Sequence, residues 1–222
     1  MKYSVMKRLA LFVCATAAAA GALTACVPLV MGGAAAGTAL VVTDRRTSGA
    51  QLEDEGIELR AASRIRGNLG TRVRVNVTSY NRQVLLTGEV PNAQDKQLVE
   101  QVVSRVENVV SVVNELAVLD SPSLMERSSD LLVTGRVKAM LLDARDLQSN
   151  AFKVVTERGT TYLMGRVTQR EADRATEVVR ATPGVQKVIR LLEIISEEEL
   201  ARIRVGAASA QPQAAAAKPS SN

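Results

Sequence analysis

The feature that most constrains the fold of this chain is an internal duplication. The segment VLLTGEVPNAQDK, residues 84–96, returns in modified form as TYLMGRVTQREAD, residues 161–173. Both copies run from apolar residues into a glycine, a charged residue and a valine, and then into a polar segment that is typical of a helix start. Two copies are too few for a solenoid, which needs three or more stacked repeats. The duplication therefore predicts a tandem pair of small domains.

The first copy alternates helix and strand signals. Apolar residues recur at helical spacing after Gly56, valines alternate with polar residues in RVRVNVTS, and Asn92 is a candidate N-cap. The predicted elements, in order, are a helix from Gly56 to Gly70, strands over residues 72–79 and 84–90, a helix after Asn92 with Leu98, Val102 and Val106 as its apolar face, and a strand over residues 109–119.

The second copy repeats this order. Its predicted elements are a helix over residues 125–142, strands over 152–156 and 161–167, a helix over 168–181 and a strand over 185–195. Gly88 aligns with Gly165 and Val109 with Val185, at offsets of 77 and 76 residues. The sequence thus predicts an α+β protein with two αββαβ domains, at residues 56–120 and 124–195.

The pattern also predicts which side chains form the cores. We expect the stripe of the first helix to include Leu59, and the stripe of the helix over residues 125–142 to include Met140. The remaining predicted core positions are Val75, Val77, Leu86 and Val102 in the first copy, and Val133, Val137, Leu141, Val154, Leu163 and either Val178 or Val179 in the second. Gly88 and Gly165 are expected to serve tight packing of the neighbouring helix, with a ligand contact as the alternative.

The N-terminus has the features of an export signal. Basic residues precede an apolar stretch over residues 9–22, and this stretch is followed by LTAC, residues 23–26, which ends at Cys26. This ending resembles a bacterial lipobox, in which the signal, here residues 1–25, is cut off and the cysteine carries a covalent lipid. The alternative is an ordinary secretory signal with two incidental cysteines, Cys14 and Cys26. We expect no other cofactor.

Residues 26–55 are predicted to be a lipidated tether and linker. Residues 27–42 are apolar but only sixteen long, whereas a spanning helix needs about twenty residues. A membrane-proximal tether and a short inserted helix both remain open. By resemblance to lipoprotein sorting signals, the absence of Asp at Val27 favours the outer membrane. After the second copy, residues 196–222 predict a short helix and a disordered tail.

Composition excludes several functions. The chain contains no His, so serine–histidine, cysteine–histidine and histidine–metal chemistry are absent, and no nucleophile–base pair replaces them. We therefore expect no enzymatic activity. Loss of Lys2, Lys7 and Arg8 with the signal leaves 25 basic against 23 acidic residues, a net charge of about +2. This weakens the case for nucleic-acid binding, which favours a strongly basic surface.

One helix of the second copy indicates a contact surface. Leu131 and Leu132 lie beside the predicted core stripe, with Arg136 and Lys138 close by in the sequence. Aliphatic side chains flanked by cations suit the headgroup region of an anionic membrane. The alternative is that both leucines belong to the core or pack against the first domain.

The repeated pattern resembles the BON domain, and the segments RVNVTSYNRQVLLTGEVPNAQ and TYLMGRVTQREA resemble the dual-BON outer-membrane lipoproteins of the DolP type. The resemblance covers residues 56–195. It implies a three-stranded mixed sheet backed by two helices in each domain, a location at the outer membrane facing the periplasm, binding of anionic phospholipid and a role in envelope integrity. A periplasmic adaptor that binds envelope proteins through the same helix is the second reading.

Overall fold

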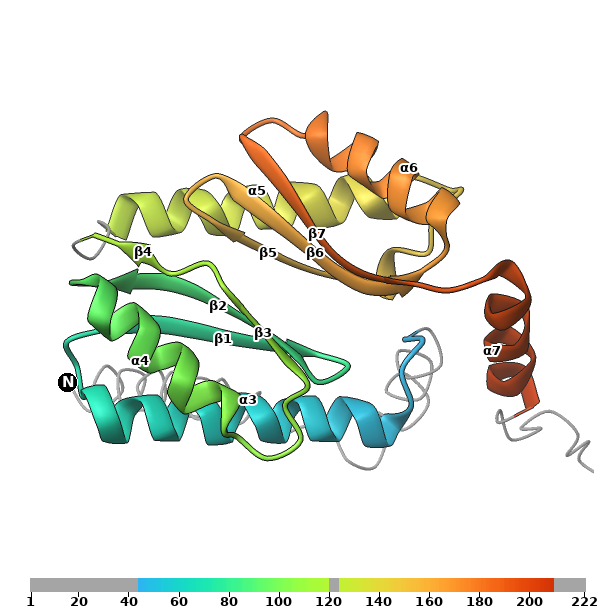
Figure 1. Cartoon of the computed structure of the whole chain (residues 1–222). Helices are drawn as coiled ribbons and strands as arrows, with labels where there is room; N and C mark the ends of the chain where they lie inside the picture. Colours follow the sequence, from blue (N-terminus) through green and yellow to red (C-terminus); the bar gives the residue numbers. More distant parts are fainter. Residues whose placement is uncertain (1–43, 120–123, 210–222) are drawn as a thin grey trace, which may run out of the picture. The chain divides into compact units, whose positions relative to one another are not determined.

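The computed structural model describes residues 44–119 and 124–209, which form two domains of the predicted αββαβ order (Figure 1). The first domain consists of α3 (Ser48–Leu69), β1 (Arg74–Tyr80), β2 (Gln83–Val90), α4 (Ala93–Ser104), β3 (Ser111–Asn114) and β4 (Ala117–Val118). The second consists of α5 (Leu124–Asp143), the short 3-10 helix η1 (Ser149–Ala151), β5 (Phe152–Glu157), β6 (Thr160–Val167), α6 (Gln169–Arg180) and β7 (Lys187–Ile194), and is followed by α7 (Glu197–Ser209).

Each sheet is mixed, as predicted. In the first domain β2 pairs antiparallel with β1 and parallel with β3 and β4. In the second, β6 pairs antiparallel with β5 and parallel with β7. The third strand of the first sheet is split in two, because the chain turns inward at Leu116, which is 2% exposed. The fold class is therefore confirmed, with one interrupted strand.

Two helices pack on one face of each sheet and enclose a core (Figure 1). Leu86 and Leu163 are fully buried, and Val133, Val137, Leu141 and Val154 are buried, as predicted. Val178 and Val179 are both buried, where only one of the two was expected. Val75 and Val77 are only partly buried, since β1 is an edge strand. Leu59 and Met140 were predicted core residues but are 73% and 41% exposed. Leu59 is two residues from Ile57, which places it on the opposite side of the helix.

The buried face of α4 differs in part from the predicted one: Val106, just beyond the helix end, is buried as predicted, but Leu98 and Val102 are not the most buried residues. Val99 and Val103 are fully buried, whereas Leu98 and Val102 are only partly buried. The cause is Asp95, which lies one turn before Val99 and is itself buried because Arg72 binds its carboxylate at 2.8 Å. The buried residues of α4 are therefore Asp95, Val99 and Val103, which follow one another at a spacing of four.

The first helix begins eight residues earlier than predicted. Residues 43–55 were expected to be linker, yet α3 starts at Ser48, where the Thr47 hydroxyl caps it by accepting a hydrogen bond from the amide of Ala50 at 3.1 Å. Asp54, one turn and a half into the helix, is 1% exposed. Cys26, the signal, residues 27–42 and the tail beyond Ser209 lie outside the described residues.

Each of the two aligned glycines permits close approach of the backbone at, or just before, the start of the antiparallel neighbour strand, and not of an α-helix as predicted. A Cβ atom on Gly88 would collide with the carbonyl oxygen of Arg74, and one on Gly165 with that of Ala151. Gly88 also has a φ of +117°, which side chains rarely tolerate. The repeated glycine thus belongs to the strand pairing of each domain.

The sheet faces that carry no helix form a third apolar cluster. Its buried members are Tyr80, Leu85, Tyr162 and Met164, and its partly buried members are Val113, Val155, Ile189 and Leu191. The cluster therefore contains side chains of both domains. Around it, Lys153 Nζ lies 2.8 Å from Glu58 Oε1, and Arg74 pairs with Glu157.

Candidate functional site

Helix α5 buries one face and exposes the other. Val133, Val137 and Leu141 are in the core of the second domain, at 4%, 0% and 1% exposure. Leu131 and Leu132 are 74% and 62% exposed. The two leucines are therefore not core residues, and the interpretation that placed them there is wrong.

The exposed surface is longer than the sequence pattern indicated. Leu142 is 71% exposed, and Leu131, Gly135, Lys138 and Leu142 follow one another at spacings of four, three and four along the helix. Ala139 is also exposed, beside this row. We call Leu131, Leu132, Gly135, Lys138, Ala139 and Leu142 the α5 face. Leu142 was not predicted to belong to this surface, because it is eleven residues from Leu131 and not adjacent to it in the sequence.

The α5 face carries a cation and has another beside it. Lys138 lies within the row, and Arg136 is exposed next to it. Arg136 Nη1 makes a 3.4 Å contact with the carbonyl oxygen of Pro183, a long hydrogen bond that leaves the guanidinium charge uncompensated. Among the described residues, no ion pair holds either side chain. Both cations are therefore open to an anion outside the protein.

The N-terminal half of the helix is held in place by Asp130. Its carboxylate accepts hydrogen bonds from the backbone amides of Arg158, at 2.8 Å, and Gly159, at 3.0 Å. These amides form the turn between β5 and β6, where both residues have positive φ. Asp130 thus fixes the helix to the sheet immediately before Leu131. The exposed leucines are consequently presented on a rigid element.

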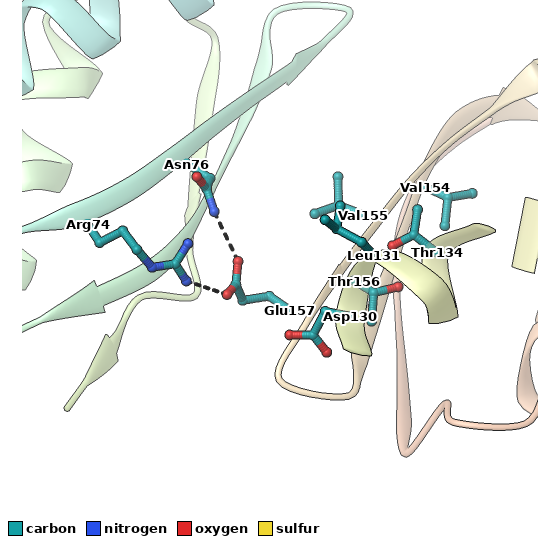
Figure 2. Close-up of a pocket in the computed structure, with 9 residues that line it drawn as sticks. All are labelled: Arg74, Asn76, Asp130, Leu131, Thr134, Val154, Val155, Thr156 and Glu157. Carbon is teal, nitrogen blue, oxygen red and sulfur yellow. Dashed lines mark hydrogen bonds and ion pairs between the residues drawn. The ribbon is translucent and has the colours of Figure 1, made fainter. Parts of the chain in front are cut away.

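A hollow of about 390 Å³ lies beside Leu131 (Figure 2). Val154, Val155, Thr134 and Thr156 form its apolar and hydroxyl wall; the rest of the lining is Arg74, Asn76, Asp130, Leu131 and Glu157. Figure 2 shows Arg74 and Asn76 pointing to Glu157, and Asn76 Nδ2 lies 3.0 Å from its Oε2.

The hollow offers little to an anion. Arg74 already binds two carboxylates, those of Glu157 and of Glu89, the latter at 2.6 Å. Burial disfavours the charge of Arg74, but these two acids more than offset it and raise the pKa of the guanidinium. The cation is thus fully used within the protein.

The described residues include no group of three or more His, Cys, Asp or Glu side chains arranged to hold a metal ion. Within the same ranges, no helix has the length and apolar character needed to cross a bilayer.

Comparison with known proteins assigns the family. The BON domain matches residues 54–120 and 129–196. Over 198 residues the chain is 36% identical to the outer membrane lipoprotein DolP of Haemophilus influenzae, which covers 88% of this chain and 100% of that protein. The chain belongs to the dual-BON outer-membrane lipoproteins of the DolP type.

Two other relatives match the chain over shorter ranges. This DolP-type chain is 31% identical over 154 residues to the 21 kDa hemolysin of Actinobacillus pleuropneumoniae, across 68% of this chain and 79% of the relative. It is 32% identical over 117 residues to the osmotically-inducible protein Y of Escherichia coli, across 51% of this chain and 58% of the relative.

Proposed function

We propose that this DolP-type lipoprotein is anchored in the outer membrane through a lipid on Cys26, faces the periplasm, and binds anionic phospholipid with the α5 face. In this way it supports the barrier function of the membrane. The supporting observation is the set of exposed leucines on α5, Leu131, Leu132 and Leu142, beside two cations that no acid of the described chain neutralises.

The energetics favour a weak, anchored contact. A fully buried leucine contributes about 1.5–3 kcal/mol, and an interfacial site buries it only in part. Each cation near an anionic surface adds about 1 kcal/mol. The sum corresponds to modest affinity for a free domain. A lipid on Cys26 would keep the domain at the bilayer, and the high effective concentration makes modest affinity sufficient.

Sedimentation with liposomes tests this function. Residues 27–222, without the signal and the anchor, are mixed with vesicles of phosphatidylcholine alone or with added phosphatidylglycerol. Binding should require phosphatidylglycerol and should fall with Leu132→Glu, while the circular dichroism spectrum of the variant stays that of the wild type. Binding that is equal on both vesicle types would contradict the electrostatic part of the proposal.

Leu59→Glu is the matched control. Leu59 is 73% exposed, as much as Leu131, but it belongs to α3 of the first domain. The same change of a leucine to an acid should leave sedimentation nearly unchanged. If Leu59→Glu abolishes binding while Leu132→Glu does not, the first domain makes the contact and the assignment to α5 is wrong.

A protein adaptor remains the second candidate because of one observation on α5. Gly135 and Ala139 lie between the leucines, and a Cβ atom on Gly135 would meet no atom within 4 Å. Two small residues leave a shallow strip that could accept a ridge of side chains from a partner helix. Absence of sedimentation with any vesicle would favour this reading.

A further inference from the structure

The four residues before α3 contain two adjacent arginines that bind different domains. Arg45 and Arg46 follow Asp44, the first residue that the structure describes, and precede the cap residue Thr47. This segment was predicted to be linker. Arg45 is nevertheless 5% exposed, a degree of burial that arginine reaches only when its charge is paired.

Arg45 is bound to the second domain. Its Nη1 and Nη2 lie 2.7 Å from Oε2 and Oε1 of Glu171, and both side chains are 2% exposed. Nη1 also donates to the carbonyl oxygen of Arg166 at 2.9 Å, and Nη2 to Gln148 Oε1 at 3.3 Å. The fork of the guanidinium thus matches the carboxylate in two parallel hydrogen bonds.

Glu171 is itself part of the start of α6. It forms a capping box with Thr168, whose amide donates to Glu171 Oε2 at 3.0 Å. Burial disfavours the charge of this carboxyl, but the bonds from Arg45 and from the Thr168 amide more than offset it and lower its pKa. An arginine from outside the second domain therefore completes the N-terminus of a helix inside it.

Arg46 is bound to the first domain. Its Nη1 lies 2.6 Å from Asp54 Oδ2, and its guanidinium lies over the ring of Tyr80, 4.2 Å from the centroid. Asp54 in turn accepts hydrogen bonds from the hydroxyl of Ser79 and from the backbone amide of Asn81, each at 2.7 Å. Asp54 thus connects α3, to which it belongs, with Ser79 at the end of β1 and with the β1–β2 turn.

These contacts close a ring through both domains. The amide of Arg166 donates to the Tyr80 hydroxyl at 3.3 Å, while its carbonyl accepts from Arg45. Arg46, the next residue in the chain, stacks on Tyr80. In this ring Arg45 is hydrogen-bonded to the carbonyl oxygen of Arg166, and the amide of Arg166 is hydrogen-bonded to Tyr80. Tyr80 contacts the guanidinium of Arg46, which is joined to Arg45 by a peptide bond.

We propose that Asp44–Arg46 is a strap that locks the two BON domains onto one another. Loss of Arg45 leaves the Glu171 carboxylate buried without a counter-ion, with the Thr168 amide still bonded to it, and a buried charge without its ionic partner is strongly unfavourable. The second domain then relieves this by moving away from the first. The buried apolar cluster between the sheets opens as a result.

Tyrosine fluorescence reports this opening directly. The chain has three tyrosines and no tryptophan, and Tyr80 and Tyr162 both belong to the cluster between the sheets, at 5% and 4% exposure. Tyr3, if it is retained, adds the same signal to every variant. In the full chain purified in detergent, we expect acrylamide to quench wild-type fluorescence weakly and Arg45→Ala fluorescence at least twofold more strongly.

A double variant separates the strap from simple loss of stability. Glu171→Gln in the Arg45→Ala background removes the unpaired buried charge but does not restore the connection. We expect the double variant to unfold closer to the wild-type temperature and to stay strongly quenched. If the double variant is quenched as weakly as the wild type, then the pair serves only the second domain and the strap proposal fails.

Two control variants complete the experiment. Asn81→Ala removes an exposed contact between the domains, Nδ2 to Glu193 Oε2 at 2.7 Å. Arg174→Ala removes an exposed arginine of α6 that pairs with Asp146 at 2.9 Å. Both variants should keep wild-type quenching. If either control variant is quenched by acrylamide as strongly as Arg45→Ala, then the strap has no special role in holding the domains together.

Discussion

Leu86 of β2 and Leu163 of β6 occupy equivalent positions in the two domains, 77 residues apart. Each is fully buried, and each lies opposite a valine of the preceding antiparallel strand, Val77 or Val154. The duplication therefore extends from the sequence to the register of the sheets, and one of these two leucines belongs to each core.

Substitution of either leucine should destabilise its own domain. Truncation of a buried leucine to alanine typically costs about 2–5 kcal/mol, so Leu86→Ala and Leu163→Ala should each lower the free energy of unfolding by that amount in urea denaturation. Leu59→Ala, on the exposed side of α3, should change it by less than about 0.5 kcal/mol. Similar values for all three would mean that the strand faces are assigned incorrectly.

The glycines provide a second test of the strands. Gly88→Ala forces a Cβ atom against the carbonyl oxygen of Arg74 in β1, and Gly165→Ala forces one against that of Ala151 just before β5. We expect each to cost about 1–3 kcal/mol or more in urea denaturation. Gly135→Ala on α5 meets open space and should stabilise the chain by up to about 1 kcal/mol through helix propensity. Neutral behaviour of Gly88→Ala would contradict the described register.

Acid should weaken the protein through Asp54 and Glu171. Burial alone would raise the pKa of each carboxyl, but hydrogen bonds and the arginines lower it below the ordinary values of 3.8 and 4.5. A lowered pKa contributes stability above the ordinary value, and this stability is lost as pH falls from about 5. Glu171→Gln should therefore reduce the loss of unfolding free energy between pH 6 and pH 3.5.

The control for this pH dependence is Glu177→Gln, also on α6. The side chain of Glu177 is 70% exposed and lies 3.4 Å from Arg174. This variant should lose unfolding free energy with pH as steeply as the wild type. If Glu171→Gln shows the same steepness, the buried pair does not contribute to acid sensitivity.

Membrane binding should weaken with salt. Exposed charges are screened over about 10 Å at 0.1 M salt, whereas the contribution of the leucines is not. Sedimentation of residues 27–222 with phosphatidylglycerol vesicles should fall between 0.05 M and 0.5 M NaCl. Lys138→Gln should lower binding at low salt and show a smaller salt effect; an unchanged salt effect would remove Lys138 from the contact.

Cys26 is predicted to carry the anchor. Cys26→Ser should block lipid attachment, so that labelled palmitate is no longer incorporated and the protein is left unprocessed or mislocalised. Cys14→Ser, within the predicted signal, is the matched control and should be labelled as in the wild type. Labelling of Cys26→Ser at the wild-type level would refute the lipobox assignment.

The order of helices and strands in both domains could be predicted because it depends on patterns of residues that are close together in the sequence. Alternating valines in β1, the aligned glycines and the cap at Asn92 depend on neighbours close in the chain. The early start of α3 was missed because Asp54 gains its partners from the turn at Asn81, 27 residues away. Leu131 and Leu132 of α5 were found, since each stands outside a simple helical stripe, but Leu142 was not. Arg45 could not be found, because its partner Glu171 is 126 residues away.

Strands β2 and β6 are buried on both faces, which explains why Leu85 and Leu86 are neighbours and both fully buried. A single BON copy of this sequence would leave Leu85, or Tyr162 and Met164, facing water. Such a half-protein would be prone to self-association. A second copy in the same chain supplies the cover at a fixed ratio of one to one. The duplicated domain thus covers the apolar sheet face that a single domain would expose to water.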